Sequence, residues 1–190
     1  RFGMWCDGSF AWLDEAGWSI QLAYVEDSLV TNVTARHDGL GIELQWNDGI
    51  HQRDCVYMKR VVVRNLGGAP KEVRVFFHHD LMIDGNEVGD TAAYYPGNRT
   101  VFHYKRSSYF MFNGRSDMGG IYQYSTGVKR FQSAEGTWRD AEDGALMGNA
   151  IAQGSVDSTI SFRTQVAPGN EKTVYYWMAV GADLEEVKRL

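Results

Sequence analysis

The fold class is decided by a short alternating stretch, residues 40–46, which reads LGIELQW. Every second residue from Leu40 to Trp46 is apolar, so the apolar side chains share one side of an extended chain. Such alternation is typical of a β-strand with one buried face. Residues 160–166, ISFRTQV, repeat the pattern. A third alternating run is predicted to bury Ile20, Leu22 and Tyr24 on one strand face.

Two other runs are apolar without alternation, at Val73–Ile83 and at Val174–Val180. In an all-β protein, continuous apolar runs of this length suit strands that are buried on both faces between two layers. We therefore expect these two strands to be among the most buried, with Phe77 and Trp177 fully enclosed.

Turn signals separate the strand-like runs at regular intervals. Glycine and asparagine supply positive φ in such turns, and proline presets one. At a mean strand length of about 5–6 residues plus turns, a chain of 190 residues accommodates about a dozen or more strands. The expected fold is all-β, a large antiparallel two-sheet super-sandwich. The turn signals are Asp7-Gly8, Asp38-Gly39, Asn47-Asp48-Gly49, Gly67–Pro70, Asp84-Gly85-Asn86, Pro96-Gly97-Asn98 and Pro168-Gly169-Asn170.

Helical signals are sparse and occur at two places. Residues 138–146 predict a short helix, and residues 183–190 read as an amphipathic helix that begins at an Asp183 N-cap. Its acidic first turn and its later lysine and arginine suit the helix dipole. We expect a β-sandwich domain over residues 1–182 and the start of a linker helix over 183–190, with the natural protein continuing further.

The composition excludes several classes of function. Hydrophobic residues make up 44% of the chain and the formal charge is -5, so the chain can bury a core and lacks the basic character of a general nucleic-acid or anionic-membrane binder. No apolar run approaches the roughly 18 residues of a membrane-spanning helix. No secretory leader opens the sequence, which favours a cytoplasmic location. Cys6 and Cys55 both lie in strand-like runs and are expected to be buried free thiols.

The histidine cluster His78-His79-Asp80 is the only metal-like motif. Neighbouring residues of a strand point to opposite faces, so His78 and His79 do not readily share a metal ion. A buried structural pair is the expected role. The acidic segment at residues 84–90 resembles a calcium loop only weakly, because it lacks EF-hand spacing and the closing glutamate. We predict no metal site and no cofactor.

The segment from Asp84 to Gly97 is predicted as one long loop that carries two tyrosines. Long loops with aromatic residues are often functional, because their rings stack on sugars or fill interfaces. The alternative is an aromatic corner packed on its own sandwich. The candidate substrate-rim residues on this loop are Glu87, Asp90, Tyr94 and Tyr95. No motif or pair of carboxylates indicates a catalytic site, so no catalytic residue is predicted.

Several short segments together resemble the N-terminal domain of bacterial and archaeal family 15 glycoside hydrolases, the glucoamylase and glucodextranase group. The resemblance implies a galactose-mutarotase-like super-sandwich, a linker helix and then an (α/α)6 barrel that carries both catalytic glutamates beyond Leu190. It also implies that strands precede Arg1. The segments are Arg1–Gly8, Tyr24–Val30, Asp80–Ile83, Gly89–Pro96 and His103–Arg106.

The leading hypothesis is a non-catalytic domain of a glucoamylase-like α-glucosidase, which the resemblance implies cleaves α-glucans or α-glucosides with inversion. The partner would be the barrel of the same chain. An independent carbohydrate-binding module is the alternative, and a mutarotase-like enzyme using His78, His79 and Glu87 is a third. A binding module would show a planar row of aromatic residues on one sheet face, whereas a docking domain would show an exposed apolar patch.

Overall fold

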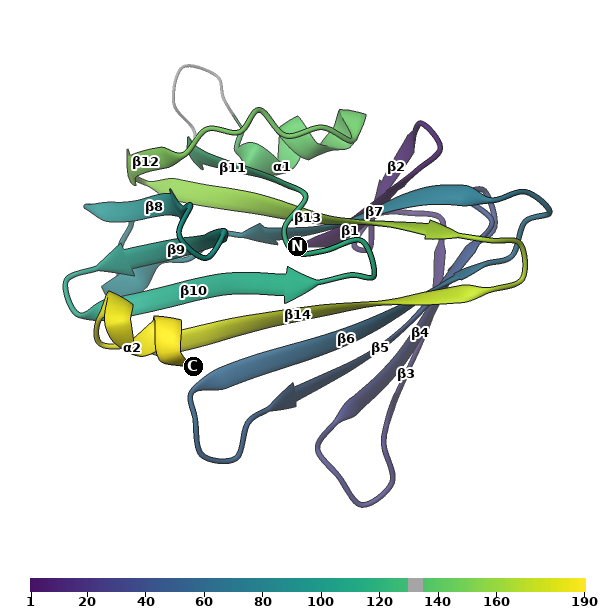
Figure 1. Cartoon of the computed structure of the whole chain (residues 1–190), viewed down its shortest axis with the longest axis horizontal. Coiled ribbons are helices and arrows are strands. Elements are labelled where there is room, and N and C mark those ends of the chain that lie inside the picture. The colour runs from purple at the N-terminus through teal and green to yellow at the C-terminus, as the bar shows by residue number, and fades with distance from the viewer. Residues whose placement is uncertain (130–134) are drawn as a thin grey trace.

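The computed structural model describes residues 1–129 and 135–190, and within them the strands form two facing antiparallel sheets (Figure 1). This arrangement confirms the all-β two-sheet sandwich. The small, five-stranded sheet has the order β11 (Gln123–Val128), β13 (Val156–Val166), β7 (Lys71–His79), β1 (Phe2–Cys6), β2 (Ser9–Trp12). The large, nine-stranded sheet has the order β12 (Ile151–Gly154), β8 (Asp90–Tyr95), β9 (Thr100–Lys105), β10 (Ser108–Arg115), β14 (Glu171–Gly181), β6 (Val56–Asn65), β5 (Ile42–Ile50), β4 (Thr31–His37), β3 (Trp18–Tyr24).

The core lies between the two sheets, where the alternating runs place their apolar residues. Leu44 from the large sheet and Phe162 from the small sheet are completely buried. Phe77 is the centre of an aromatic stack, with its ring centroid 4.2 Å from Tyr176 of the facing sheet and 5.1 Å from Phe2. The prediction of an enclosed Phe77 is confirmed.

The sheets differ in size, and this leaves one end of the large sheet uncovered. In Figure 1, β3, β4 and β5 extend well below the small sheet. Ile20 and Leu22 are 48% and 66% exposed, and Tyr24 is exposed as well. The predicted buried face of this strand is therefore wrong. The alternation is real, but no strand of the small sheet covers it.

The predicted burial of the two continuous runs is correct for β7 but wrong for β14. Trp177 on β14 is only half-buried, whereas nearly all of β13 is buried. The outer face of β14 is covered only near Ala179, where Val187 of the C-terminal helix packs. Both faces of β13 are covered, because a helical segment lies over its outer side at Thr159.

Two predicted irregular segments are strands. Asn47-Asp48-Gly49 lies inside β5, and the chain reverses at residues 51–55 instead. The Asp48 carboxylate accepts hydrogen bonds from Thr31 on β4 and Tyr57 on β6, and these cross-strand bonds hold the triplet in an extended conformation. The predicted loop from Asp84 to Gly97 is irregular only before β8, apart from the hairpin turn that follows Tyr95.

The helices match the prediction. Residues 137–143 form α1 (Thr137–Asp140) and the 3-10 helix η2 (Ala141–Asp143), and α2 spans Leu184–Arg189. The Asp183 side chain accepts a hydrogen bond of 2.8 Å from the Glu186 amide, as an N-cap does. The 3-10 helix η1 is Ile83–Gly85.

The cysteine prediction is half correct. Cys6 is buried in β1, and burial raises the pKa of its thiol to about 11. Cys55 is exposed, because it lies in the hairpin connection just before β6 rather than within a strand.

Candidate functional site

The predicted rim begins as a short loop, residues 82–89, that leads into β8. Asp90 is almost completely buried, and its Oδ1 lies 3.2 Å from Nζ of Lys105. The same ammonium group donates hydrogen bonds of 3.0 Å to the carbonyl oxygens of Ile83 and Asn86. Lys105 therefore ties down the loop and balances the Asp90 charge in a site that excludes water.

Glu87 is held from the other side of the loop. Its carboxylate lies 3.0 Å from Nζ of Lys129 and accepts a 2.9 Å hydrogen bond from Ser155 Oγ. Lys129 also bonds Asp80. Burial alone would lower the pKa of Lys129, but the hydrogen bonds to Asp80 and Glu87 outweigh burial and raise it. The acidic loop is thus anchored within its own sandwich.

The two predicted tyrosines point to opposite faces of the large sheet, as neighbours on a strand do. Tyr94 faces the small sheet and stacks on Tyr124, with ring centroids 3.7 Å apart. Tyr95 faces outward, where Lys188 Nζ of α2 lies 5.0 Å from its ring centroid. The structure therefore does not bring both rings to one side, and a sugar could stack on only one of them.

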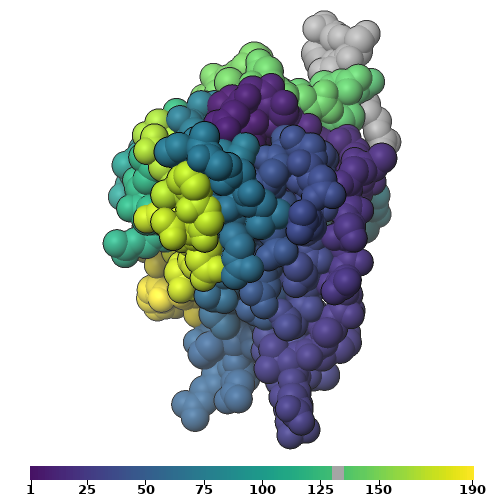
Figure 2. Space-filling model, turned by 90° about the vertical axis from the view of Figure 1, so that its right-hand side faces the viewer, coloured from purple at the N-terminus to yellow at the C-terminus, as the bar shows by residue number. Residues whose placement is uncertain are grey.

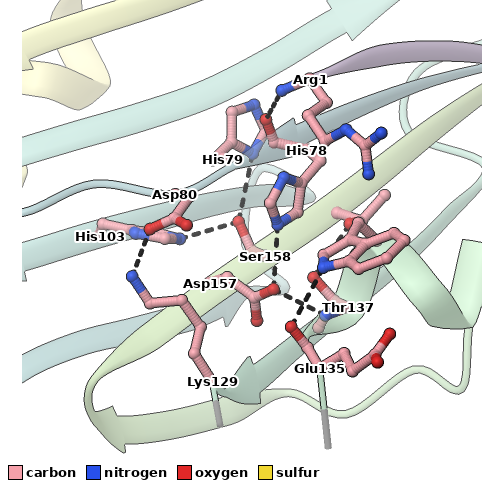
Figure 3. A network of polar contacts seen from close by, with 12 residues as sticks. Arg1, His78, His79, Asp80, His103, Lys129, Glu135, Thr137, Asp157 and Ser158 are labelled. Atoms are coloured by element: carbon pink, nitrogen blue, oxygen red, sulfur yellow. Dashed lines mark hydrogen bonds and ion pairs between the residues drawn. The ribbon is translucent and has the colours of Figure 1, made fainter. Parts of the chain in front are cut away.

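Three buried histidines form a polar network between and behind the sheets (Figure 3). His78 faces the outer side of the small sheet, where its Nε2 lies 2.9 Å from Asp157 Oδ2. His79 faces the large sheet and contacts Ser158 Oγ at 3.1 Å. His103 reaches the same hydroxyl from β9 at 2.8 Å. The predicted burial of His78 and His79 and their opposite facing are confirmed.

Burial sets the charge state of this network. Desolvation, followed by the nearby His78, lowers the pKa of His103 to about 3, and desolvation lowers the pKa of His79 well below its ordinary value. Both imidazoles are neutral at physiological pH. They are sealed from solvent, so this network stabilises the junction of the sheets rather than offering a substrate site.

A second polar cluster lies on the uncovered part of the large sheet, and sequence reasoning missed it. Asp48 accepts hydrogen bonds from Thr31 Oγ1 (2.8 Å), from the Tyr57 hydroxyl and from Lys59. Lys59 Nζ also lies 5.2 Å from the Trp46 ring centroid. Burial favours neutral Asp48, but the bonds from Lys59 and Tyr57 outweigh it and lower the pKa of Asp48. The sequence around Asp48 predicted a turn, so it gave no indication that Asp48 would meet partners on neighbouring strands.

An apolar groove of about 550 Å³ adjoins the Asp48 cluster. It runs between two hairpin connections, residues 25–30 and 51–55, which form the two lobes at the lower end of Figure 2. Leu29 and Ile50, at its walls, are 93% and 76% exposed. We call the exposed apolar surface here the open face; it comprises Ile20, Leu22, Tyr24, Leu29 and Ile50.

Two further searches concern metals and membranes. In residues 1–129 and 135–190, no group of three or more histidine, cysteine, aspartate or glutamate side chains is arranged to hold a metal ion. Across the same residues, no helix combines the length and apolarity needed to cross a membrane.

Comparisons with known proteins identify the fold. No protein-family model matches the sequence, and no curated protein matches it significantly. A bacterial glucoamylase complexed with acarbose superposes on 100% of this chain with a TM-score of 0.71 at 11% identity. A protein assigned as a kojibiose phosphorylase from the human microbiome superposes on 95% with a TM-score of 0.56 at 8% identity.

The chain spans 27% of that glucoamylase and 21% of that phosphorylase. At such low identities the likeness shows the fold alone. The chain is thus a β-sandwich with the fold of one part of that glucoamylase and of that phosphorylase.

Proposed function

We propose that this chain is the non-catalytic N-terminal β-sandwich of a larger protein, a glucoamylase-like α-glucosidase of family 15. One observation carries the proposal: all of this chain superposes on about a quarter of a bacterial glucoamylase. The rest of the parent protein would supply an (α/α)6 catalytic barrel acting on an α-glucan or α-glucoside. This domain would support that barrel.

Three carboxylates support a non-catalytic role, two from the predicted rim and Asp48 from the second polar cluster. Asp90 is paired with Lys105, Glu87 with Lys129, and Asp48 with Lys59. A glycosidase needs one carboxyl group that donates a proton and a second, about 6.5–9.5 Å away for inversion, that activates water. Here each of the three carboxylates is instead engaged by a lysine of its own domain.

The open face supports docking over independent carbohydrate binding. Its exposed side chains are mainly aliphatic, which suits a protein partner. Among the described residues, the exposed aromatic side chains are Tyr24, Tyr122 and Tyr175. Tyr24 and Tyr175 lie on opposite faces of the large sheet, so they form no planar row for a polysaccharide. We propose that the catalytic barrel of the same polypeptide covers the open face.

The substrate-rim role of Glu87, Asp90, Tyr94 and Tyr95 stays a proposal, and the structure guides its test. Asp90 is buried against Lys105 and Tyr94 stacks on Tyr124, so substituting either would change stability as well as any rim contact. Tyr95→Ala is the cleaner variant. In the longer protein it should raise KM for an α-glucoside, whereas Tyr175→Ala, on the same outer face but remote from the loop, should not.

The proposal is tested first on the chain itself. We expect no glucose release from maltose, trehalose, dextran or starch, and unchanged mobility in gels containing dextran or starch. Turnover that a Glu87→Gln variant abolishes would overturn the non-catalytic role. Retardation by the polysaccharide would instead support a carbohydrate-binding module.

A further inference from the structure

A small polar pocket lies where the chain crosses from β10 in the large sheet to β11 in the small one. Its volume is about 120 Å³, far smaller than the groove of the open face and below the usual 300–1,000 Å³ of a drug-sized ligand site. The pocket brings together two arginines and a glycine pair. Its main lining residues are Arg99, Ser116, Gly119, Gly120, Tyr122 and Arg163.

Arg163 is a half-buried cation that forms no ion pair with any carboxylate in residues 1–129 and 135–190. Its guanidinium stacks on Tyr122, 4.3 Å from the ring centroid, and its Nη1 lies 3.4 Å from the Tyr122 hydroxyl. Nε is enclosed and has no hydrogen-bond partner among the described residues. The residue directly opposite in the ladder is another arginine, Arg74, whose charge Glu72 already balances at 2.7 Å. The two arginines are thus a like-charged cross-strand pair, and Glu72 balances only the charge of Arg74.

Arg99 adds a second positive charge to the same pocket. It occupies the β8–β9 turn with a φ of 55°, a left-handed conformation that asparagine or glycine usually adopts. In the part of the chain that the structure describes, no carboxylate forms an ion pair with Arg99 or Arg163. The nearby Asp117 is engaged elsewhere, 2.8 Å from Lys172 Nζ and 2.7 Å from Thr164 Oγ1.

We propose that this pocket binds one small oxyanion, a phosphate or a carboxylate group, between Arg163 and Arg99. A planar guanidinium matches the oxygens of both groups, and the half-buried position of Arg163 strengthens the contact. The chain as a whole carries a net charge of -5, so a cationic pocket is a local feature rather than part of a basic surface. The inference is independent of the proposed docking role, since the pocket and the open face share no residue.

Inorganic phosphate is the first probe, titrated by calorimetry and by thermal unfolding at constant ionic strength. We expect saturable binding and a rise in Tm with phosphate. Arg163→Gln and Arg99→Gln should each weaken the affinity about tenfold, the loss expected when one charge-assisted hydrogen-bonding group is removed. Arg163→Lys keeps the charge but loses the planar fork, so its affinity should fall between wild type and Arg163→Gln.

Arg53→Gln is the matched control, because Arg53 is an exposed arginine at a hairpin tip of the open face and its loss changes net charge equally. Arg99 is exposed in a turn, so its variant tests the site even if Arg163→Gln fails to fold. Equal phosphate affinity in Arg99→Gln, Arg53→Gln and wild type would overturn the proposal.

Acetate distinguishes the two sources of the oxyanion. Saturable binding of phosphate with no response to acetate would identify a free phosphate-type ligand. Saturable binding of acetate alone would identify a carboxylate, such as an acidic side chain of a neighbouring segment. Saturation by neither ion would show that Arg163 serves only to pack on Tyr122, and the oxyanion site would be rejected.

Discussion

The two ends of the large sheet share the same alternating pattern of apolar residues, but the small sheet covers only one of them. At the end formed by β8, β9, β10 and β14, the small sheet covers the inner face, and even the histidines there have partners. At the end formed by β3, β4 and β5, the inner face continues past the small sheet and leaves Leu22 and Leu29 in solvent.

The covered end contributes to the stability of the domain, whereas the open face is available for interaction. At the covered end, His79 and His103 contact the same Ser158 hydroxyl, and Asp90 forms an ion pair with Lys105. The open face keeps the period of a core strand but lacks a second layer. Exposed apolar patches often mark interaction sites, and this is the basis for proposing that the open face is a docking surface.

Phe77→Ala should give the largest loss of stability, since the ring is enclosed between Tyr176 and Phe2 at the covered end. Truncating a fully buried phenylalanine costs about 3–5 kcal/mol of unfolding free energy. Urea unfolding followed by tryptophan fluorescence measures the loss. A change below about 1 kcal/mol would mean that the aromatic stack is not the centre of the core.

A pair of identical substitutions compares a covered position with an uncovered one on the same face of the large sheet. Leu44 and Leu22 lie on the same face of the same sheet, but Leu44 is fully buried and Leu22 is 66% exposed. Leu44→Ala should cost about 2–5 kcal/mol. Leu22→Ala should change the unfolding free energy by no more than about 0.5 kcal/mol. Similar losses for both variants would show that the open face is covered in the isolated chain.

Acid should destabilise the covered end through His103. Its folded pKa of about 3 lies below the value near 6.5 of an unfolded histidine, so its contribution is fully present above pH 6.5 and is lost as pH falls toward 3. From pH 7 to pH 5 the loss attributable to His103 is about 2 kcal/mol.

The measurement is urea stability at both pH values in wild type and His103→Gln, which should lose less stability on acidification. Burial, His78 and Lys129 all act on His103 in the same direction. His51→Gln is the control, because it removes an exposed histidine at the open end and should keep the wild-type pH dependence. An identical pH dependence in His103→Gln and wild type would exclude a buried neutral His103.

Sequence reasoning predicted the sandwich because alternation and turn chemistry are local properties. It also predicted the Asp183 helix start and the opposite facing of His78 and His79, which follow from helix and strand geometry. It misplaced the burial of β3 and β14, because burial there depends on whether another layer of the structure covers the strand. Ile20 to Tyr24 alternate as a core strand does, but the pattern does not show whether a second layer exists above them.

The candidate site shows the same limit of prediction from sequence, because contacts between distant residues decide its geometry. Asn47-Asp48-Gly49 has the composition of a turn, and only the cross-strand partners of Asp48 reveal an extended chain. Likewise, Asp84 to Gly97 is predicted as one loop, yet β8 begins at Asp90 because β9 and β12 pair with it on either side. Partners distant in sequence, such as Lys105 and Lys129, decide what each carboxylate does.

The smallest effect on stability is expected from the open face itself, in a Leu29→Ser, Ile50→Ser double variant. Both side chains project into solvent, so the unfolding free energy of the isolated chain should stay within about 0.5 kcal/mol of wild type. Binding of a hydrophobic dye should fall, because the apolar groove loses two of its walls. Leu66→Ser with Met147→Ser is the control, since both residues are exposed apolar side chains away from the open face and from the rim loop.

In the longer protein that we propose, the same double variant should behave differently. If the catalytic barrel covers the open face, two hydroxyls would be buried in an apolar contact, and burying a polar group without a partner is unfavourable. The barrel should then unfold at a lower temperature than in wild type, while the Leu66 and Met147 control should leave its unfolding temperature unchanged. Equal unfolding temperatures in all three proteins would place the barrel elsewhere and leave the open face to another partner.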